Sequence, residues 1–215
     1  MIDLTGYRLV IENNVVTECV PPKTQVAYET LGQRDPKWAR ILLGNSLSST
    51  LGSYGCLVTS MAVLAGCTPQ QMNDALRRNG GFQAEPRGAY MAYAGFTTAF
   101  EKASESCGTR QKVKFVHMSG KMLAGQERPA GWTQKLTDWL EGGNPAIVEV
   151  DMDIKNTSQQ QHFVAALPEK VIGNIQIVDP WDKAGDTYGK KQMLLPEYGK
   201  DIASAAWRYI LYEVT

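Results

Sequence analysis

The sequence has little of what metal-binding, nucleic-acid-binding and membrane-associated proteins rely on. Only two of its 215 residues are histidines, and its four cysteines include no Cys-x-x-Cys pair, so we expect neither a zinc ribbon nor a thioredoxin motif. The 22 Lys and Arg balance the 22 Asp and Glu, which removes the electrostatic basis for sequence-independent binding to nucleic acid or an anionic membrane. A P-loop and a GxGxxG motif are also missing, and we expect neither a metal nor an organic cofactor.

An export signal and a long apolar run are also missing from the sequence. Met1–Tyr7 contains no basic region followed by a continuous apolar stretch, which a signal peptide requires. The longest apolar runs, Leu57–Ala65 and Ala146–Val150, fall short of the ~20 residues that a membrane-spanning helix needs. We therefore expect synthesis in a cytoplasm without a signal peptide, and another route for any action in a virion or after release.

The composition is that of an ordinary globular chain, with 43% apolar and 20% charged residues, and a chain of this length can bury a sizeable core. Residues 1–30 differ from the rest, because two short extended candidates, Tyr7–Ile11 and Asn14–Thr17, precede Pro21-Pro22. We expect an N-terminal arm or hairpin over residues 1–30 and one domain over residues 31–215.

The first half of the larger domain has the apolar spacing of helices. Thr68 and Gln71 have the spacing of a capping box, which marks the start of a helix that stops at Asn79. The other expected helices are Leu57–Ala65, ending at Gly66, Ala89–Ala103, and Trp132–Glu141.

The second half changes to the short apolar and alternating runs of strands. The expected strands are Val113–His117, Ala146–Val150, His162–Leu167, Ile172–Val178 and Trp207–Glu213. Helices followed by strands with short connections predict an α+β fold with an antiparallel sheet.

Cys56 stands directly after Gly55, at the expected start of a buried helix. The unpaired N–H groups and positive dipole end of a helix favour a thiolate at that position. The same N–H groups can stabilise an oxyanion. The sequence therefore predicts a nucleophilic cysteine, with an inert buried cysteine as the alternative.

His162 is the histidine best placed to act as the base for such a cysteine. It starts an expected strand, and Asp179 ends the next one. An antiparallel hairpin centred near Lys170 and Val171 places the two residues opposite each other within about one position, where Cβ atoms are ~4.5–5.5 Å apart. Asp179 can then orient the imidazole. The alternative is that His162 is a polar residue at a sheet edge and that Asp179 belongs to a turn. We expect His117, which has no nearby carboxylate in its strand, to be structural.

The chain resembles the C39-like branch of the papain-like cysteine peptidases, found in bacterial and bacteriophage proteins. The segments that carry the resemblance are Gln33–Trp38, Tyr54–Cys56 with its helix, Gln161–Val164 and Val178–Trp181.

The resemblance covers about residues 31–215 and implies a papain-like fold, in which a helical half presents the cysteine and an antiparallel sheet presents the histidine and aspartate. It implies Cys56 as nucleophile, His162 as base and Asp179 as the group that orients His162. It also implies Gln33 as an oxyanion donor, although 23 positions separate Gln33 from Cys56, against only a few in better-known members.

Several alternatives stay open at this point. Asn45 and Ser53 are substitutes for Gln33 as the oxyanion donor, and Leu57 follows the cysteine where many relatives have glycine. The leading hypothesis is a cysteine peptidase whose substrate is a protein or the peptide part of a bacterial cell wall, with a phage-encoded or virion-associated enzyme as one form. A non-catalytic structural or binding protein of a phage assembly, docked through residues 1–30, is the second. Acyl transfer is the third.

The sequence leaves the specificity of such an enzyme unassigned. We expect the residues that contact the substrate to lie on three loops, which are Gly80–Gly88, Ser119–Gly131 and Asp182–Gly189.

Overall fold

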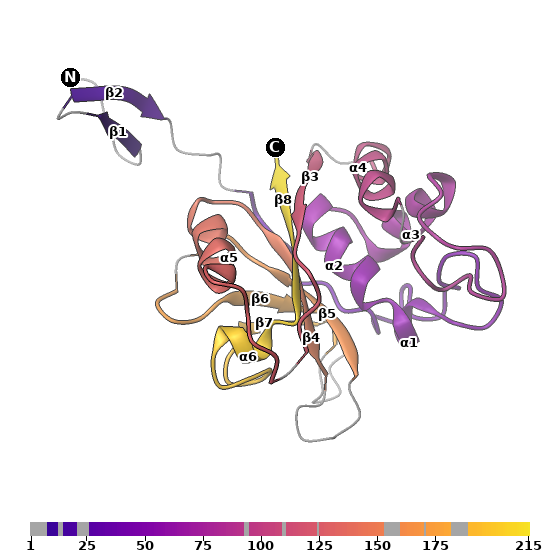
Figure 1. Ribbon diagram of the computed structural model, residues 1–215. Helices are drawn as coiled ribbons and strands as arrows, with labels where there is room; N and C mark the ends of the chain where they lie inside the picture. The colour runs from indigo at the N-terminus through magenta and orange to yellow at the C-terminus, as the bar shows by residue number, and fades with distance from the viewer. Residues whose placement is uncertain are drawn as a thin grey trace.

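Six antiparallel strands form the sheet around which the larger part of the chain is built (Figure 1). The structure, a computed structural model, describes residues 8–12, 15–20, 26–92, 95–108, 111–123, 125–152, 160–169, 171–181 and 189–215. The strand order is β3-β8-β4-β5-β6-β7, and every neighbouring pair is antiparallel. The strands are β3 (Val113–Met118), β4 (Ala146–Asp151), β5 (Gln161–Ala166), β6 (Gln176–Asp179), β7 (Lys190–Met193) and β8 (Arg208–Val214).

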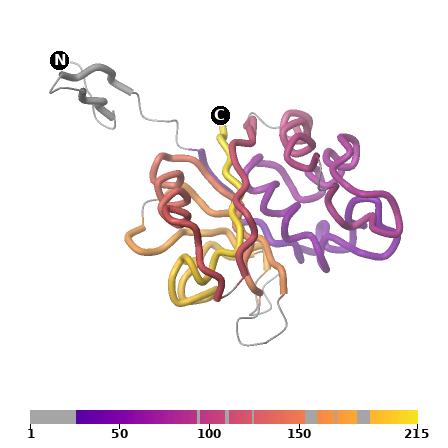
Figure 2. The backbone as a smooth tube through the Cα atoms, viewed as in Figure 1, coloured from indigo at the N-terminus to yellow at the C-terminus, as the bar shows by residue number. Residues whose placement is uncertain are grey.

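Helices cover both faces of this sheet. Figures 1 and 2 show that the helices that precede β3 form a group to one side of the sheet and that the helices that follow β3 form a second group on the other side. The first group is α1 (Leu51–Tyr54), α2 (Cys56–Ala65), α3 (Pro69–Arg78) and α4 (Phe96–Ser106), and the second is α5 (Trp132–Glu141) and α6 (Ile202–Ala205). The α+β class with an antiparallel sheet is therefore confirmed.

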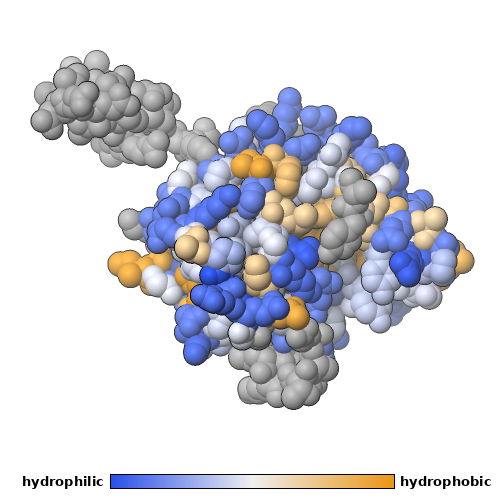
Figure 3. Space-filling view, in the orientation of Figure 1, coloured by the Kyte–Doolittle hydropathy of each residue, from blue (hydrophilic) through white to orange (hydrophobic). Residues whose placement is uncertain are grey.

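The central strands β4 and β5 are buried along almost their whole length, and most of their residues are apolar, because both faces of the sheet are covered. Ile147 packs into the core under α2–α4, whereas Val148 packs into the core under α5 and α6. Phe163 and Val164 divide in the same way, as the alternation of side chains along a strand requires. The exterior face seen in Figure 3 is accordingly polar over most of its area, with apolar side chains in small separate groups.

Helix α2 is fixed at both ends by local sequence. It follows α1 with only Gly55 between them, and it ends at Gly66, whose φ of 66° is the left-handed conformation that glycine adopts without strain. The expected capping box of Thr68 and Gln71 is confirmed at the start of α3. The N-terminus of α2 therefore has a defined position relative to the sheet.

Some expected elements are wrong or incomplete. The helix expected over Ala89–Ala103 begins only at Phe96, because Met91 forms a bridge with Phe82 and residues 89–92 belong to a loop. The strand expected from Ile172 begins at Gln176. The sequence patterns also missed α1, α6 and β7, which have four residues each, too few for a periodic signal.

A separate two-stranded antiparallel sheet, β1 (Arg8–Glu12) and β2 (Val15–Val20), lies in the predicted N-terminal arm. Tyr28 packs against the core under α2–α4, so contacts with the larger domain begin slightly before residue 31. The division of the chain into an arm over residues 1–30 and a domain over residues 31–215 stays a prediction.

No helix within the described ranges combines the length and apolarity needed to traverse a lipid bilayer.

We expect Gly55→Ala to destabilise the protein and displace Cys56. A Cβ at Gly55 would lie 2.4 Å from the backbone oxygen of Leu51, and backbone cannot move aside as a side chain can. Overpacking of this kind costs about 1–3 kcal/mol, which urea denaturation can measure. Gly120→Ala is the control, because a Cβ there meets only the end of Met122 at 3.8 Å. Equal stability of the two variants would show that the α1–α2 junction tolerates a side chain.

Candidate active site

Cys56 is the first residue of α2 and lines a pocket of about 600 Å³. Its side chain is half-buried. The first N–H groups of a helix have no partner within the helix. The thiol of Cys56 and these backbone donors therefore lie together at one end of α2, beside the pocket. The pocket is lined mostly by neutral side chains from the helical half and the sheet, among them Gln33, Phe82 and Phe163.

His162 and Asp179 form a hydrogen-bonded pair that is almost completely buried. The Nε2 atom of His162 lies 2.7 Å from Oδ1 of Asp179. The exposed fractions of the two residues are 0% and 2%. The pair comes from adjacent strands, β5 and β6, so the sheet itself sets the separation of the two groups.

The pairing register differs from the expected one by two positions. Ala165 pairs with Val178 and Ala166 with Ile177. Continued along the strands, this register places Asp179 opposite Val164 and diagonal to His162, so the expectation that the two residues oppose each other within about one position is wrong. Because the offset is even, both side chains still emerge on the same face of the sheet, and they meet there.

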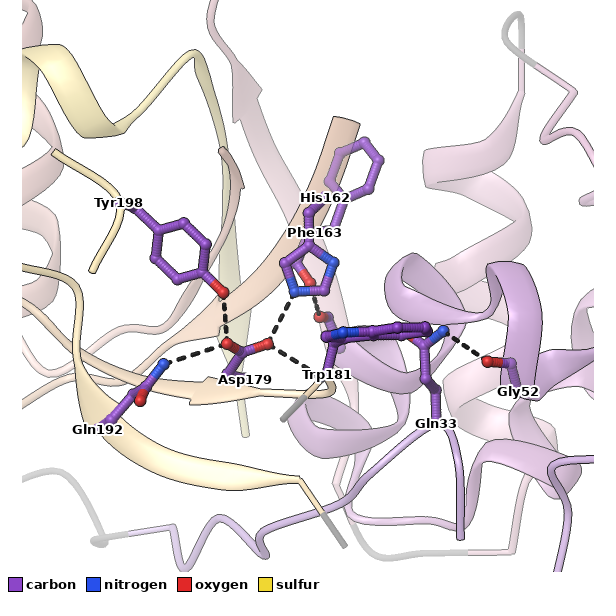
Figure 4. A network of polar contacts seen from close by, with 9 residues as sticks. Gln33, Gly52, His162, Phe163, Asp179, Trp181, Gln192 and Tyr198 are labelled. Carbon is purple, nitrogen blue, oxygen red and sulfur yellow. Dashed lines mark hydrogen bonds and ion pairs between the residues drawn. The ribbon is translucent and has the colours of Figure 1, made fainter. Parts of the chain in front are cut away.

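Four donors surround the carboxylate of Asp179 (Figure 4). Oδ1 accepts hydrogen bonds from His162 and from the backbone N–H of Trp181, the latter at 2.9 Å. Oδ2 accepts from Nε2 of Gln192 at 3.1 Å and from the hydroxyl of Tyr198. This satisfies a buried charge that would otherwise be strongly destabilising, and it fixes the direction in which His162 points.

The pKa of His162 depends on two opposing effects, its burial and its polar neighbours. Burial lowers it, but the hydrogen bond with Asp179 and the interaction with the Cys56 side chain more than compensate, and the pKa rises to about 9. The interaction with Cys56 brings the third predicted residue into the group. Nε2 is occupied by Asp179, and Nδ1 is buried without a hydrogen-bond partner among the described residues. Nδ1 is therefore the ring atom left for the sulfur.

Gln33 lies at the same pocket as Cys56 and is 1% exposed. One N–H of its amide donates to the backbone oxygen of Gly52 at 3.2 Å, and a glutamine amide has two such hydrogens. Figure 4 shows Gln33 beyond the indole of Trp181 as seen from Asp179. The fold therefore brings Gln33 to the same pocket as Cys56 although 23 positions separate them in the sequence.

The two substitutes for Gln33 differ in position. Asn45 is exposed, and its amide donates to the backbone oxygen of Gln83 at 2.9 Å; it is not among the pocket-lining residues. Ser53 does line the pocket, with its hydroxyl 3.1 Å from that of Thr50.

The remaining histidine and two of the remaining cysteines lie away from this group. His117 is on β3, at the edge of the sheet, where burial and the nearby Lys135 lower its pKa. Cys67 and Cys107 are buried in the core under α2–α4. A hydrogen bond with Cys107, together with burial, raises the pKa of Cys67, which disfavours its reactive thiolate.

The contributions of Gln192 and Tyr198 were missed in the sequence. Gln192 is on β7, whose four residues, Lys190–Met193, contain no apolar alternation, and Tyr198 follows it in a segment without regular spacing. Two of the three expected specificity loops can be compared with the pocket. Phe82 and Gln83 of the first line it, no described residue of the second does, and most of the third lies outside the described residues. Within the described ranges, no three His, Cys, Asp or Glu side chains are grouped as a metal site would need.

Comparison with known proteins adds little to this geometry. Neither protein-family models nor curated proteins match the sequence. Among solved structures, the chain is similar to the one titled "Crystal Structure of Pseudomonas Avirulence Protein AvrPphB", at 14% identity and a TM-score of 0.33, over 74% of this chain and 89% of that one. A similarity at this level supports no conclusion about the site.

We expect the imidazole of His162 to titrate with a midpoint near pH 9, as its pKa indicates. In Asp179→Asn the midpoint falls well below that of the wild type, because burial still lowers the pKa of His162 while the carboxylate that raises it is gone. NMR titration of the two ring signals measures this, and His117 provides the internal reference. Asp138→Asn, on the exposed side of α5, should leave the midpoint unchanged.

The same pKa also predicts how the free energy of unfolding changes with pH. Since the folded state holds the His162 proton more tightly, its contribution to the free energy of unfolding is complete below pH 6.5 and lost as the pH rises to about 9. A midpoint near 6.5 in the wild type would contradict the proposed geometry.

Proposed function

We propose that the protein is a papain-like cysteine peptidase that hydrolyses peptide bonds through Cys56, His162 and Asp179. The observation that supports this most directly is a buried histidine whose Nε2 is held by Asp179, whose Nδ1 has no hydrogen-bond partner among the described residues, and whose pKa is raised by Asp179 and by the nearby Cys56. The nucleophile lies at a helix N-terminus and opens on a pocket, which is the arrangement that nucleophilic catalysis by cysteine requires.

In the first step, the Cys56 thiolate attacks the carbonyl carbon of the substrate. The new C–S bond forms as the carbonyl electron pair moves to oxygen. The backbone N–H of Cys56 and the second N–H of Gln33 are the proposed donors to that oxyanion, since both groups belong to residues at the same pocket.

In the next step, the C–N bond breaks and the amine leaves with the proton from Nδ1 of His162. The acyl group remains on Cys56 as a thioester. Neutral His162 then takes a proton from water, the resulting hydroxide attacks the thioester, and the acid product leaves with Cys56 again as thiolate and His162 as imidazolium. Asp179 touches no reacting atom in this scheme and acts as a positioning residue.

The substrate that we propose is a peptide, either in a protein or in the stem peptides of a bacterial cell wall. A phage-encoded or virion-associated enzyme remains the form suggested by the sequence resemblance, with the N-terminal hairpin as a docking element. Transfer of the acyl group to another acceptor shares every step up to the thioester. A non-catalytic protein with the same fold is the outcome that the experiments below would reveal.

We expect iodoacetamide at neutral pH to modify Cys56 much faster than Cys67 or Cys107, because those two thiols are buried and Cys56 faces an imidazolium. Peptide mapping by mass spectrometry gives the rate at each position. Cys56→Ala and His162→Ala should abolish hydrolysis of a denatured protein and of purified bacterial cell wall, assayed side by side. Cys107→Ala is the matched control and should retain hydrolysis. Slow, equal labelling of all cysteines would favour the hypothesis of a non-catalytic protein with the same fold.

Gln33→Ala should lower kcat by roughly 100- to 1,000-fold, the usual effect of removing one oxyanion donor, with little change in the alkylation rate of Cys56. Gln70→Ala, exposed on α3, serves as the control. An unaffected kcat in Gln33→Ala would assign the oxyanion donor to another group, for which Ser53 is a candidate because it also lines the pocket.

A further inference from the structure

The two oxygens of the Asp179 carboxylate have different neighbours. Oδ1 accepts from Nε2 of His162 at 2.7 Å, whereas Oδ2 accepts from the hydroxyl of Tyr198 and from Nε2 of Gln192 at 3.1 Å (Figure 4). Tyr198 is 1% exposed, and the centroid of its ring lies 6.1 Å from that of the His162 imidazole. The phenol is therefore close enough to influence the imidazole through the carboxylate that lies between them.

The sheet places Tyr198 on the same face as the histidine and the aspartate. Val164 lies two positions after His162 on β5, and Ile177 lies two positions before Asp179 on β6. Both apolar residues pack in the core under α5 and α6, which also contains Tyr198. Because side chains two positions apart on a strand share a face, the imidazole, the carboxylate and the phenol emerge into one layer of the fold.

The segment that carries Tyr198, between β7 and α6, is tied to the sheet and packed against α6. The backbone N–H of Tyr198 donates to the oxygen of Leu194 at 3.1 Å, and the N–H of Leu194 donates to the oxygen of Ile175 at 2.8 Å. On the other side, a Cβ on Gly199 would lie 2.7 Å from the backbone nitrogen of Ala205. The position of the phenol is thus set by the packed backbone around it.

The phenol hydroxyl acts on the charge of the carboxylate. A hydroxyl that donates to Asp179 turns the positive end of its dipole toward the carboxylate, and that positive end disfavours a second positive charge on the imidazole beyond it. Burial and the neighbouring Asp179 raise the pKa of Tyr198, so the hydroxyl keeps its proton while His162 titrates. Besides burial, Asp179 and Cys56 shift the pKa of His162, and Glu197 and Cys56 also act on Tyr198.

We propose that Tyr198 is a positioning residue of the reaction, which donates to Oδ2 of Asp179 and so prevents the carboxylate from holding the proton of His162 too tightly for transfer. The reaction itself rests on the proposed function, whereas the effect on His162 can be measured without it. An imidazolium that held its proton more tightly would protonate the leaving amine more slowly. It would also leave less neutral His162 to take a proton from water. Tyr198 touches no reacting atom and gives up no proton in either step.

The test compares Tyr198→Phe with the wild type by NMR titration of His162. Phenylalanine keeps the ring and removes the hydroxyl dipole, so we expect His162 to bind its proton roughly two- to fivefold more tightly, the size of one O–H dipole acting across a protein interior. The midpoint then moves to higher pH, opposite to the shift in Asp179→Asn. Tyr212→Phe is the matched control, because Tyr212 is also buried, packs in the core under α2–α4 and has a hydroxyl without a hydrogen-bond partner among the described residues. It should leave the midpoint unchanged.

The pH dependence of hydrolysis is the second measurement, with whichever substrate the wild type cleaves. The alkaline limb of kcat/KM reports loss of the imidazolium proton and should move to higher pH in Tyr198→Phe, while kcat at neutral pH falls roughly two- to fivefold. A purely structural contribution of Tyr198 would lower the activity at every pH and leave the alkaline limb in place.

An unchanged or lowered midpoint of His162 in folded Tyr198→Phe would overturn the proposal. If circular dichroism shows that this variant does not fold, Gln192→Leu replaces it, because Gln192 donates to the same oxygen from the half-buried edge strand β7. A raised midpoint in that variant supports the role of the Oδ2 donors, and an unchanged one overturns it. A raised midpoint in Tyr198→Phe without any hydrolysis by the wild type would keep the assignment of Tyr198 and remove the peptidase proposal.

Discussion

An imidazole and a carboxylate buried together in a β-sheet are the constraint on which the rest of this structure depends. Removing either group from water is costly unless it is paired and hydrogen-bonded. The sheet and the segments that follow β6 and β7 meet this requirement by giving Asp179 four donors, one of which is His162. The same contacts that stabilise the carboxylate fix the histidine ring, so stability and orientation come from one set of hydrogen bonds.

The helical half must then deliver the sulfur to that fixed ring. Ser60 lies four residues, about one turn, after Cys56 on α2, and its buried hydroxyl donates to the backbone oxygen of Phe163 at 3.1 Å. Phe163 is the residue next to His162. This contact joins α2 to β5 beside both groups, and it makes the distance between sulfur and imidazole a property of the packed core rather than of a loop.

Much of the fold follows from local patterns in the sequence. The capping box at Thr68, the stop at Gly66 and the apolar run of β4 all act over short distances, and each is where it was expected. The expected helix from Ala89 was wrong in its first turns because a bridge between Phe82 and Met91 outweighs helix propensity there. Tertiary contacts of this kind leave no periodic signal.

In the candidate site too, some features follow from local sequence and others depend on tertiary contacts. Cys56 and His162 could be predicted because glycine before a helix and a histidine before an apolar strand are local features. The pairing of His162 with Asp179 depended on the hairpin register, and the actual register differs by an even number of residues, so the two side chains still share a face. Tyr198 and Gln192 reach Asp179 only through the folded sheet, and no spacing in the sequence points to them.

The most direct test of this account is a crystal structure of the protein after reaction with a peptidyl chloromethyl ketone. The account predicts a covalent bond from Sγ of Cys56 to the inhibitor, with the inhibitor oxygen near the amide of Gln33 and the backbone N–H of Cys56. A protein that stays unmodified at Cys56, or an adduct whose oxygen points away from both donors, would contradict it.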